Sequence, residues 1–324
     1  MLFWTLDAAV AAAALLLALA VDRWWGEPPA ALHPVVWMGR ALGACGARVA
    51  PVRATGRDLW SFWLAAIIWC ALAAMVFGGA AALQWAAWAH LPAWGAALAL
   101  GLLLKPLLAW RMLRGEVLAV EAALGESLEA GRARLAWLVS RDVQRLDATA
   151  VRESAIESLA ENLSDSVVAP LLWFVLLGLP GAALYRFANT ADAMWGYPGM
   201  RGGRYWLWAG KWAARADDVL SWLPARLTAL LLWAAARGGV RWGALRLQAR
   251  TTPSPNGGWP MGAMALALGV RLSKPGVYVL NAPGRAPQAA DTQRAVHLAS
   301  KTLLALVVLA VAALLLIAIV HTHV

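Results

Sequence analysis

Four long apolar runs dominate the chain of 324 residues. They cover about residues 3–21, 60–83, 93–110 and 299–320, and each is near the length of about 20 residues that a helix needs to cross a bilayer core. We expect all four to be membrane-spanning helices. The leader Met1 to Asp7, which precedes the apolar stretch Ala8 to Val21, contains an acidic residue and no Lys or Arg, which favours a retained helix over a cleaved signal peptide.

Two further apolar runs, at about 167–185 and 219–236, contain prolines. If both crossed the bilayer, the five Arg and Lys residues of the segment 186–218 would lie outside, against the positive-inside rule. We therefore favour re-entrant insertion of both runs, with every basic connection on the cytoplasmic side. The segment 111–166 has Glu, Arg, Ala and Leu at helical spacing, and we expect it to form cytoplasmic helices.

The composition agrees with a membrane protein. Hydrophobic residues make up 61% of the chain and charged residues only 14%, against about 25% in soluble domains. The net charge of +10 arises from basic residues between the apolar runs, which fits contact with the lipid bilayer and not with nucleic acid. No strand pattern is evident. The expected fold is all-α: one polytopic membrane domain over 1–324 with about four to six spanning or re-entrant helices.

Acidic residues recur every four positions near the end of the segment 111–166. On a helix, Glu153, Glu157, Glu161 and Asp165 form one stripe beside an apolar flank. Like charges at this spacing destabilise a helix by a few tenths of a kcal/mol per pair. A bound cation is the obvious compensation.

Further acidic residues border the two interrupted runs. Asp192 follows the first run, and Asp217 and Asp218 precede the second. If these carboxylates converge with Glu161 and Asp165, their oxygens suit Mg²⁺, which prefers carboxylates together with water and substrate phosphate. A structural interpretation also stands for Asp217 and Asp218, which can cap the following helix.

Several polar motifs interrupt the apolar chain. They are Gly26-Glu-Pro-Pro29 with His33-Pro-Val35 and Gly39-Arg40, Ser140-Arg-Asp142, the stretch Glu157 to Pro170, Asn189 to Tyr197, Asp217 to Arg226, and Ser254 to Met261. In this order they resemble the motifs of a known family, the CbiB/CobD membrane proteins of cobalamin biosynthesis, which are adenosylcobinamide-phosphate synthases. The region 101–115 departs from the family pattern.

The resemblance implies an enzyme that forms an amide between adenosylcobyric acid, a corrinoid, and aminopropanol or its phosphate. Because joining a carboxylate to an ammonium ion in water is uphill, we expect ATP and Mg²⁺ to activate the carboxylate. The expected location is the inner (plasma) membrane, with the active site facing the cytoplasm. Expected partners are these substrates and the bilayer, with either a second copy of the chain or other cobalamin-pathway enzymes beside them.

Roles for individual residues follow from the matching motifs. His33 is the general-base candidate, since the ordinary pKa of a histidine side chain, about 6.5, suits that task. Glu153 lies at the edge of its motif and is expected to be a solvated surface residue. A Trp-rich face at 195–222 is expected to supply an apolar cleft for the corrinoid. The remaining candidates are Glu157, Glu161 and Asp192 for catalysis, Glu161, Asp165, Asp192, Asp217 and Asp218 for the metal, and Arg40, Asn162, Asn189, Arg215, Arg226 and Asn256 for substrate.

Two other functions remain open from the sequence. A transporter would use intramembrane carboxylates as an ion path, and it would show paired inverted halves, whereas no internal symmetry is visible. A non-catalytic membrane sensor resembling AmpE would show eroded polar clusters, whereas those of this chain are nearly intact.

Overall fold

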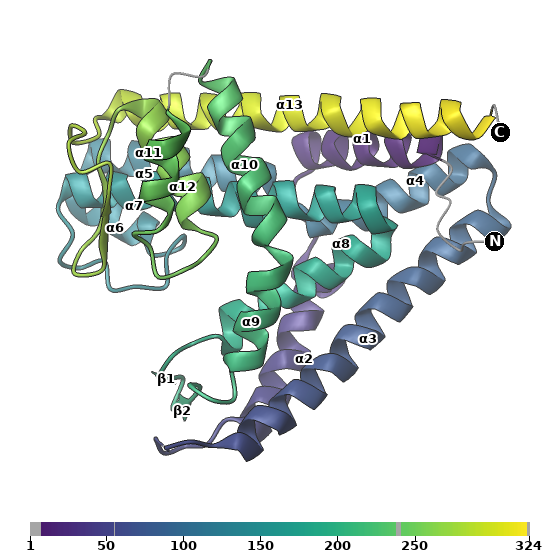
Figure 1. Ribbon diagram of the computed structural model, residues 1–324, viewed down its shortest axis with the longest axis horizontal. Coiled ribbons are helices and arrows are strands. Elements are labelled where there is room, and N and C mark those ends of the chain that lie inside the picture. The colour runs from purple at the N-terminus through teal and green to yellow at the C-terminus, as the bar shows by residue number, and fades with distance from the viewer. Residues whose placement is uncertain (1–7, 55, 238–240, 323–324) are drawn as a thin grey trace. The chain divides into compact units, whose positions relative to one another are not determined.

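The computed structural model describes residues 8–54, 56–237 and 241–322, and the chain forms two compact units. Unit 1 comprises Met1–Leu108, Ala169–Ser221 and Ala310–Val324, and unit 2 comprises Ala109–Val168 and Trp222–Leu309. Helices supply nearly all of the regular structure in both units (Figure 1). The all-α membrane fold expected from the sequence is therefore confirmed.

Unit 1 is built around helix α8. Helices α2, α3 and α9 pack against α8, whereas α1 packs against α4. The core contains Trp69, Phe187, Trp195 and Trp206, all buried. The elements of unit 1 are α1 (Ala8–Trp24), α2 (Pro34–Val49), α3 (Leu59–His90), α4 (Ala93–Leu104), α8 (Ala169–Trp195) and α9 (Lys211–Leu220), 3₁₀ turns at Ala30–Leu32 and Lys105–Leu107, and the hairpin of β1 (Met200–Arg201) and β2 (Arg204–Tyr205).

Helix α8 is interrupted in the middle of its apolar run. Gly178 has φ 70°, a conformation that a residue without a Cβ adopts readily, and Pro180 follows it. The backbone N–H of Leu179 donates to Oε1 of Gln84, a buried residue of α3, at 2.8 Å. A side chain from a neighbouring helix thus satisfies the polar group that the break exposes, which makes the break tolerable in an apolar setting.

Unit 2 contains the acidic helix α7 and the elements packed on it. Helices α5, α6 and α12 and strand β3 all contact α7. Asp147 caps α7 by accepting the N–H of Ala150 at 2.8 Å. The elements are α5 (Trp110–Glu126), α6 (Leu128–Leu135), α7 (Ala148–Leu163), a π-helical segment (Ser164–Val168), α10 (Trp222–Ala235), α11 (Trp242–Ala249), α12 (Gly258–Leu268), β3 (Leu272–Lys274), β4 (Tyr278–Leu280) and the first part of α13 (Ala289–Thr322).

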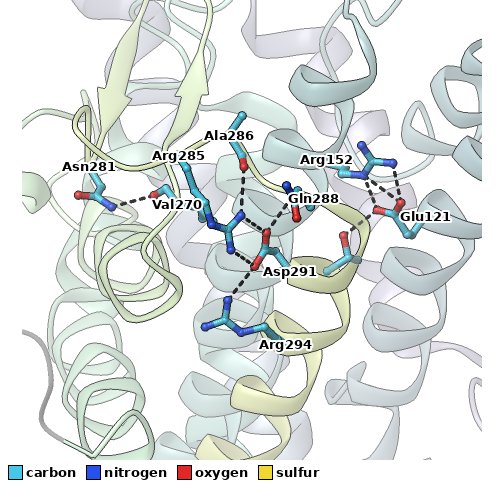
Figure 2. A network of polar contacts seen from close by, with 10 residues as sticks. Glu121, Arg152, Val270, Asn281, Arg285, Ala286, Gln288, Asp291 and Arg294 are labelled. Carbon is cyan, nitrogen blue, oxygen red and sulfur yellow. Dashed lines mark hydrogen bonds and ion pairs between the residues drawn. The ribbon is translucent and has the colours of Figure 1, made fainter.

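A polar network joins α5, α7 and the start of α13 within unit 2 (Figure 2). Arg152 binds Glu121 through Nε at 2.9 Å and Nη2 at 2.8 Å, and Thr292 donates to the same carboxylate at 2.8 Å. Asp291 is 1% exposed and accepts two hydrogen bonds from Arg285, at 2.6 and 2.8 Å. Glu121 of α5 therefore links Arg152 of α7 to Thr292 at the start of α13.

Four described helices are long and apolar enough to cross a membrane: Leu59–His90, Ala93–Glu126, Ala148–Trp195 and Ala289–Val320. The expected runs 60–83, 93–110 and 299–320 lie in three of them, and 167–185 lies in the fourth. The described part of the run 3–21 is the 17-residue helix α1, and 219–236 corresponds to the shorter α10. Re-entrant insertion stays a prediction.

Two expectations about local structure are wrong. Strands do occur, as two short antiparallel hairpins in which Met200 pairs with Tyr205 and Leu272 with Leu280. The acidic stripe is not one regular helix either, because a π-helical segment begins at Ser164 and changes the rotation of Asp165 relative to Glu161. Short π-helical segments of this kind occur frequently at functional sites.

Candidate active site

Glu153 is buried, so the expectation of a solvated surface residue is wrong. It is 1% exposed, and its Oε1 lies 3.3 Å from Nε of Arg271. Its Oε2 accepts a hydrogen bond from the hydroxyl of Ser273 in β3. The β3–β4 hairpin therefore neutralises the first carboxylate of the stripe, which explains why this acid can sit inside unit 2.

Glu157 lies one turn further along α7 and has a different cation. Its Oε2 is 3.3 Å from Nη2 of Arg141, and the same Nη2 lies 2.5 Å from the hydroxyl of Ser154. Tyr278 of β4 also faces this carboxylate: burial raises the pKa of the Tyr278 hydroxyl above its ordinary value, and the negative charges of Glu157 and Glu161 raise it further. The neutral phenol is thus maintained as a hydrogen-bond donor.

Glu161 contacts the loop 254–260, which is distant in sequence. A Cβ added to Gly257 would lie 3.1 Å from Oε1 of Glu161, so the glycine lets the loop backbone approach the carboxylate. Ser254 shapes this loop by accepting the N–H groups of Asn256 at 3.2 Å and Gly257 at 3.1 Å. Lys274 and Arg141 supply positive charge to Glu161.

Arg226 joins the same loop. Its Nη1 donates to Oδ1 of Asn256 at 2.9 Å, and its Nη2 donates to the carbonyl of Pro255 at 3.3 Å. The guanidinium lies 4.4 Å from the ring centroid of Trp222 and 5.0 Å from that of Trp259. Two aromatic faces and an amide hold the cation in a fixed orientation, which is a suitable arrangement for binding a carboxylate or phosphate.

Unit 1 holds a second acidic cluster, on α8 and α9. Asn189 donates to Asp217 at 3.5 Å, and Ser221 donates to it at 3.4 Å. Burial raises the pKa of Asp217 to about 7, and the negative charges of Asp192 and Asp218 contribute to the rise. Gly196 is required beside Asp192, because a Cβ at this glycine would overlap the carboxylate.

These acids have the right chemistry for Mg²⁺ but do not form a complete protein cage. Asp192, Asp217 and Asp218 offer hard oxygen atoms, and a cation would relieve the repulsion that raises the pKa of Asp217. Among the described residues, however, no group of three or more His, Cys, Asp or Glu side chains is placed to hold a metal ion. Water and substrate phosphate would have to complete the coordination, and metal binding stays a prediction.

His33 lies in a third polar cluster, within unit 1, around a lysine that sequence reasoning missed. Lys105 is 2% exposed, and its Nζ lies 3.1 Å from Oδ1 of Asp22 and 2.9 Å from Oε2 of Glu27. His33 Nε2 is 3.2 Å from the same Glu27 oxygen. The signal was available, because a lysine inside the apolar run 93–110 needs partners at membrane depth.

The predicted corrinoid cleft at 195–222 is not open where Trp195 and Trp206 lie. These rings stack at 5.9 Å between centroids, and both are buried in the core of unit 1. An apolar pocket of about 800 Å³ lies elsewhere in unit 1, and Trp25, Leu32 and Trp37 line it together with Glu27 and Lys105. The expectation for these two tryptophans is therefore wrong.

The remaining candidates take individual positions. Arg40 on α2 is exposed, and Arg215 on α9 is exposed but opposes the rise that burial causes in the pKa of Asp218. Asn162 donates to the carbonyl of Ser158 in its own helix at 2.9 Å. The candidate residues divide between the two units. Unit 2 contains Glu157, Glu161, Asn162, Asp165, Arg226 and Asn256, and unit 1 contains His33, Arg40, Asn189, Asp192, Arg215, Asp217 and Asp218.

Comparison with known proteins gives one consistent result. The family model "CobD/Cbib protein" matches residues 15–307. The "Probable cobalamin biosynthesis protein CobD" of Methanothermobacter thermautotrophicus is 40% identical over 295 residues, which cover 90% of this chain and 93% of that protein. The "Cobalamin biosynthesis protein CobD" of Chromobacterium violaceum is 41% identical over 316 residues, covering 94% and 97%. No solved structure matches the chain.

Fold and motifs together define a polytopic helical membrane protein whose buried carboxylates are paired with cations and polar loops. The chain belongs to the CobD/CbiB family, because the family model covers most of its length and its relatives are about 40% identical over nearly their whole length. The resemblance seen in the sequence motifs is thereby confirmed.

Proposed function

We propose that this member of the CobD/CbiB family forms the amide bond between adenosylcobyric acid and aminopropanol or its phosphate, with ATP and Mg²⁺. The names of the relatives support a role in cobalamin biosynthesis. The reaction itself follows from the family resemblance and from the chemistry of the site.

The contact between Glu161 and the loop 254–260 carries the proposal. This contact brings two motifs, about 90 residues apart in sequence, into one polar site in unit 2. The site combines carboxylates that can accept a proton with a guanidinium, Arg226, that two tryptophans hold in place. Amide formation needs both functions, because a protonated amine must lose its proton and an anionic acyl substrate must be bound and activated.

The proposed reaction passes through an acyl phosphate. A carboxylate oxygen of the corrinoid attacks the γ-phosphorus of ATP, and ADP leaves. The amine, after losing a proton to Glu157 or Glu161, attacks the acyl carbon, and phosphate leaves with one oxygen from the original carboxylate. Arg226 and Asn256 hold an anionic or amide group of the substrate. Mg²⁺, when bound, would neutralise phosphate charge. Glu161 and Asp165 are the candidates to hold it in unit 2, and Asp192, Asp217 and Asp218 form a separate candidate set in unit 1.

The proposed location is the inner membrane, with the site on the cytoplasmic side. Four candidate spanning helices support membrane insertion. The orientation is supported by the basic residues in the connections between apolar runs, which the positive-inside rule assigns to the cytoplasm. Such an orientation gives the site access to cytoplasmic ATP.

The test is direct condensation. Purified full-length protein in nanodiscs receives adenosylcobyric acid labelled with ¹⁸O in its carboxylate, aminopropanol phosphate, ATP and Mg²⁺, and a parallel reaction receives free aminopropanol. We expect a cobinamide product in at least one reaction, ADP in equal amount, and one ¹⁸O atom in the released phosphate. A folded protein that forms no product with either amine refutes the proposal, and ¹⁸O in AMP refutes the acyl-phosphate route.

A further inference from the structure

The hairpin β1–β2 carries two arginines that the proposed reaction does not use. Arg201 and Arg204 occupy the two ends of the Gly202–Gly203 turn and lie opposite each other in the hairpin register. Within the part of the chain that the structure describes, neither forms an ion pair with an acidic side chain. Two like charges in one six-residue hairpin, Met200–Tyr205, therefore remain without an acidic side-chain partner among the described residues.

Both guanidinium groups are held in place. Arg201 Nη1 donates to the carbonyl of Ala193 in α8 at 2.6 Å, and its Cζ lies 4.1 Å from the ring centroid of Tyr197. Arg204 Nη1 donates to the carbonyl of Ala50, the C-cap residue that directly follows α2, at 2.7 Å. Each guanidinium has five N–H donors, so most of them are left for another acceptor.

The carbonyl contacts do not neutralise the two arginines. Both accepting carbonyls lie at helix C-termini, and each helix end contributes roughly half a negative charge. Two guanidinium charges and two helix ends leave roughly one positive charge at the hairpin. Capping of a helix C-terminus thus accounts for one hydrogen bond of each arginine. It does not account for the positive charge that remains at the hairpin.

The two arginines face a hollow of about 370 Å³. The rest of its lining is apolar or glycine, so its charged edge is basic: Gly43 and Ala47 of α2, Met194 of α8, Gly202 and Trp206. Every residue of the hollow belongs to unit 1. A phosphate oxygen cluster fits a pair of fixed guanidinium forks, and an apolar lining fits the carbon skeleton attached to it.

We propose that this hollow is a phosphate-binding site, filled by a phosphate group on a lipid headgroup or on a soluble molecule. The site is independent of the proposed amide ligation, because it rests on the hairpin geometry alone. Just after the hairpin in sequence, Nζ of Lys211 lies 4.2 Å from the ring centroid of Trp208. Aromatic and basic residues of this kind gather at membrane–water interfaces, where both phosphate sources are available.

The decisive variant is Ala47→Glu. Ala47 is exposed on α2 and lines the hollow, so a glutamate there places a carboxylate beside both arginines without removing their bonds to Ala193 and Ala50. Glutamate is also a good helix former. The matched control is Ala44→Glu, at another exposed position of the same helix that does not line the hollow.

Two binding arms distinguish the phosphate sources, both with full-length protein. Native mass spectrometry counts bound phosphatidylglycerol, with phosphatidylcholine as the reference lipid, and ³¹P NMR measures binding of inorganic phosphate in phosphatidylcholine nanodiscs. We expect Ala47→Glu to weaken binding about tenfold or more in one arm, while Ala44→Glu stays within about twofold of wild type. Loss in the lipid arm identifies a headgroup, and loss in the phosphate arm identifies a soluble ligand.

Equal binding by Ala47→Glu and Ala44→Glu in both arms overturns the proposal. If Ala47→Glu does not fold, Gly43→Glu replaces it. A Cβ at Gly43 would lie 3.7 Å from Cε of Met194, an ordinary contact, so the side chain has room at the edge of the hollow. The same outcomes then decide the proposal.

Discussion

The acids of α7 and those of the α8–α9 cluster are buried or half-buried, yet they are stabilised differently. In unit 2, Glu153 and Glu157 each lie 3.3 Å from an arginine. In unit 1, the Asp217 carboxylate accepts from two neutral groups of the described residues, the amide of Asn189 and the hydroxyl of Ser221, and burial together with the charge of Asp192 raises its pKa to about 7.

This difference separates two kinds of carboxylate. An acid that already has a cation is a fixed part of the structure, and its removal disturbs folding. An acid that faces another acid gains from a proton or a bound cation. We therefore expect the ion pairs of Glu153 and Glu157 to contribute to the stability of unit 2, and we propose that the α8–α9 acids bind a cation in unit 1.

The largest effect is expected when Glu157 loses its cation. Arg141→Ala should lower the free energy of unfolding by about 3–5 kcal/mol, because it leaves a charge buried without a partner. Denaturant unfolding in detergent measures the loss. Arg145→Ala, at an exposed position four residues away, is the control. Equal losses in the two variants contradict the assignment.

A smaller effect is expected from the pH dependence of Asp217. Its pKa in the folded protein is about 7, above the ordinary 3.8, so the folded state binds more protons between these values. The stabilisation is complete below about pH 4 and is lost as pH rises through about 7. Asp217→Asn should remove this loss and be more stable than wild type at pH 8 by on the order of 1–3 kcal/mol.

Thermal unfolding from pH 4 to pH 8 measures this dependence. Glu126→Gln, which removes an exposed carboxylate, should keep the wild-type pH dependence. If the melting temperature of Asp217→Asn depends on pH as strongly as that of Glu126→Gln, Asp217 does not have a raised pKa in the folded protein.

Cation binding gives a third, smaller effect. At pH 8, Mg²⁺ at ten times its Kd should stabilise the wild type by about 1.4 kcal/mol, since it binds only the folded state. Asp217→Asn should lose this stabilisation, while Arg141→Ala should keep it. KCl at the same ionic strength is the control. If KCl raises the melting temperature of the wild type as much as Mg²⁺ does, there is no specific Mg²⁺ site.

The smallest effect is expected at Lys274, which supplies positive charge to Glu161 from the surface of unit 2. Lys274 is exposed, and exposed ion pairs contribute only about 0–1 kcal/mol. Lys274→Ala should therefore change the free energy of unfolding by less than about 1 kcal/mol. A loss as large as that of Arg141→Ala would mean that the two cations are equivalent, contrary to the comparison.

The apolar runs predict the long helices well because chain length and hydropathy alone decide whether a segment can cross a bilayer. The break in α8 is also foreseeable from Pro180 in its run. The hairpin strands are not, because β1 and β2 have two residues each and depend on the elements they pack against.

Site prediction from sequence succeeds where a motif carries its own chemistry and fails where partners come from afar. Arg226 and Asn256 lie in quoted motifs, and the structure brings them to 2.9 Å. Glu153 was misjudged because its partners, Arg271 and Ser273, are more than 100 residues away. No local pattern reveals such a pairing.

We propose that Glu161, held against the loop 254–260, takes part in amide formation. The rate of cobinamide formation by Glu161→Gln, compared with that by the exposed control Glu126→Gln in nanodiscs with saturating substrates, tests this role. We expect a loss of about 100-fold or more for Glu161→Gln, consistent with removal of a general base, and a wild-type rate for the control. A wild-type rate in folded Glu161→Gln contradicts the claim.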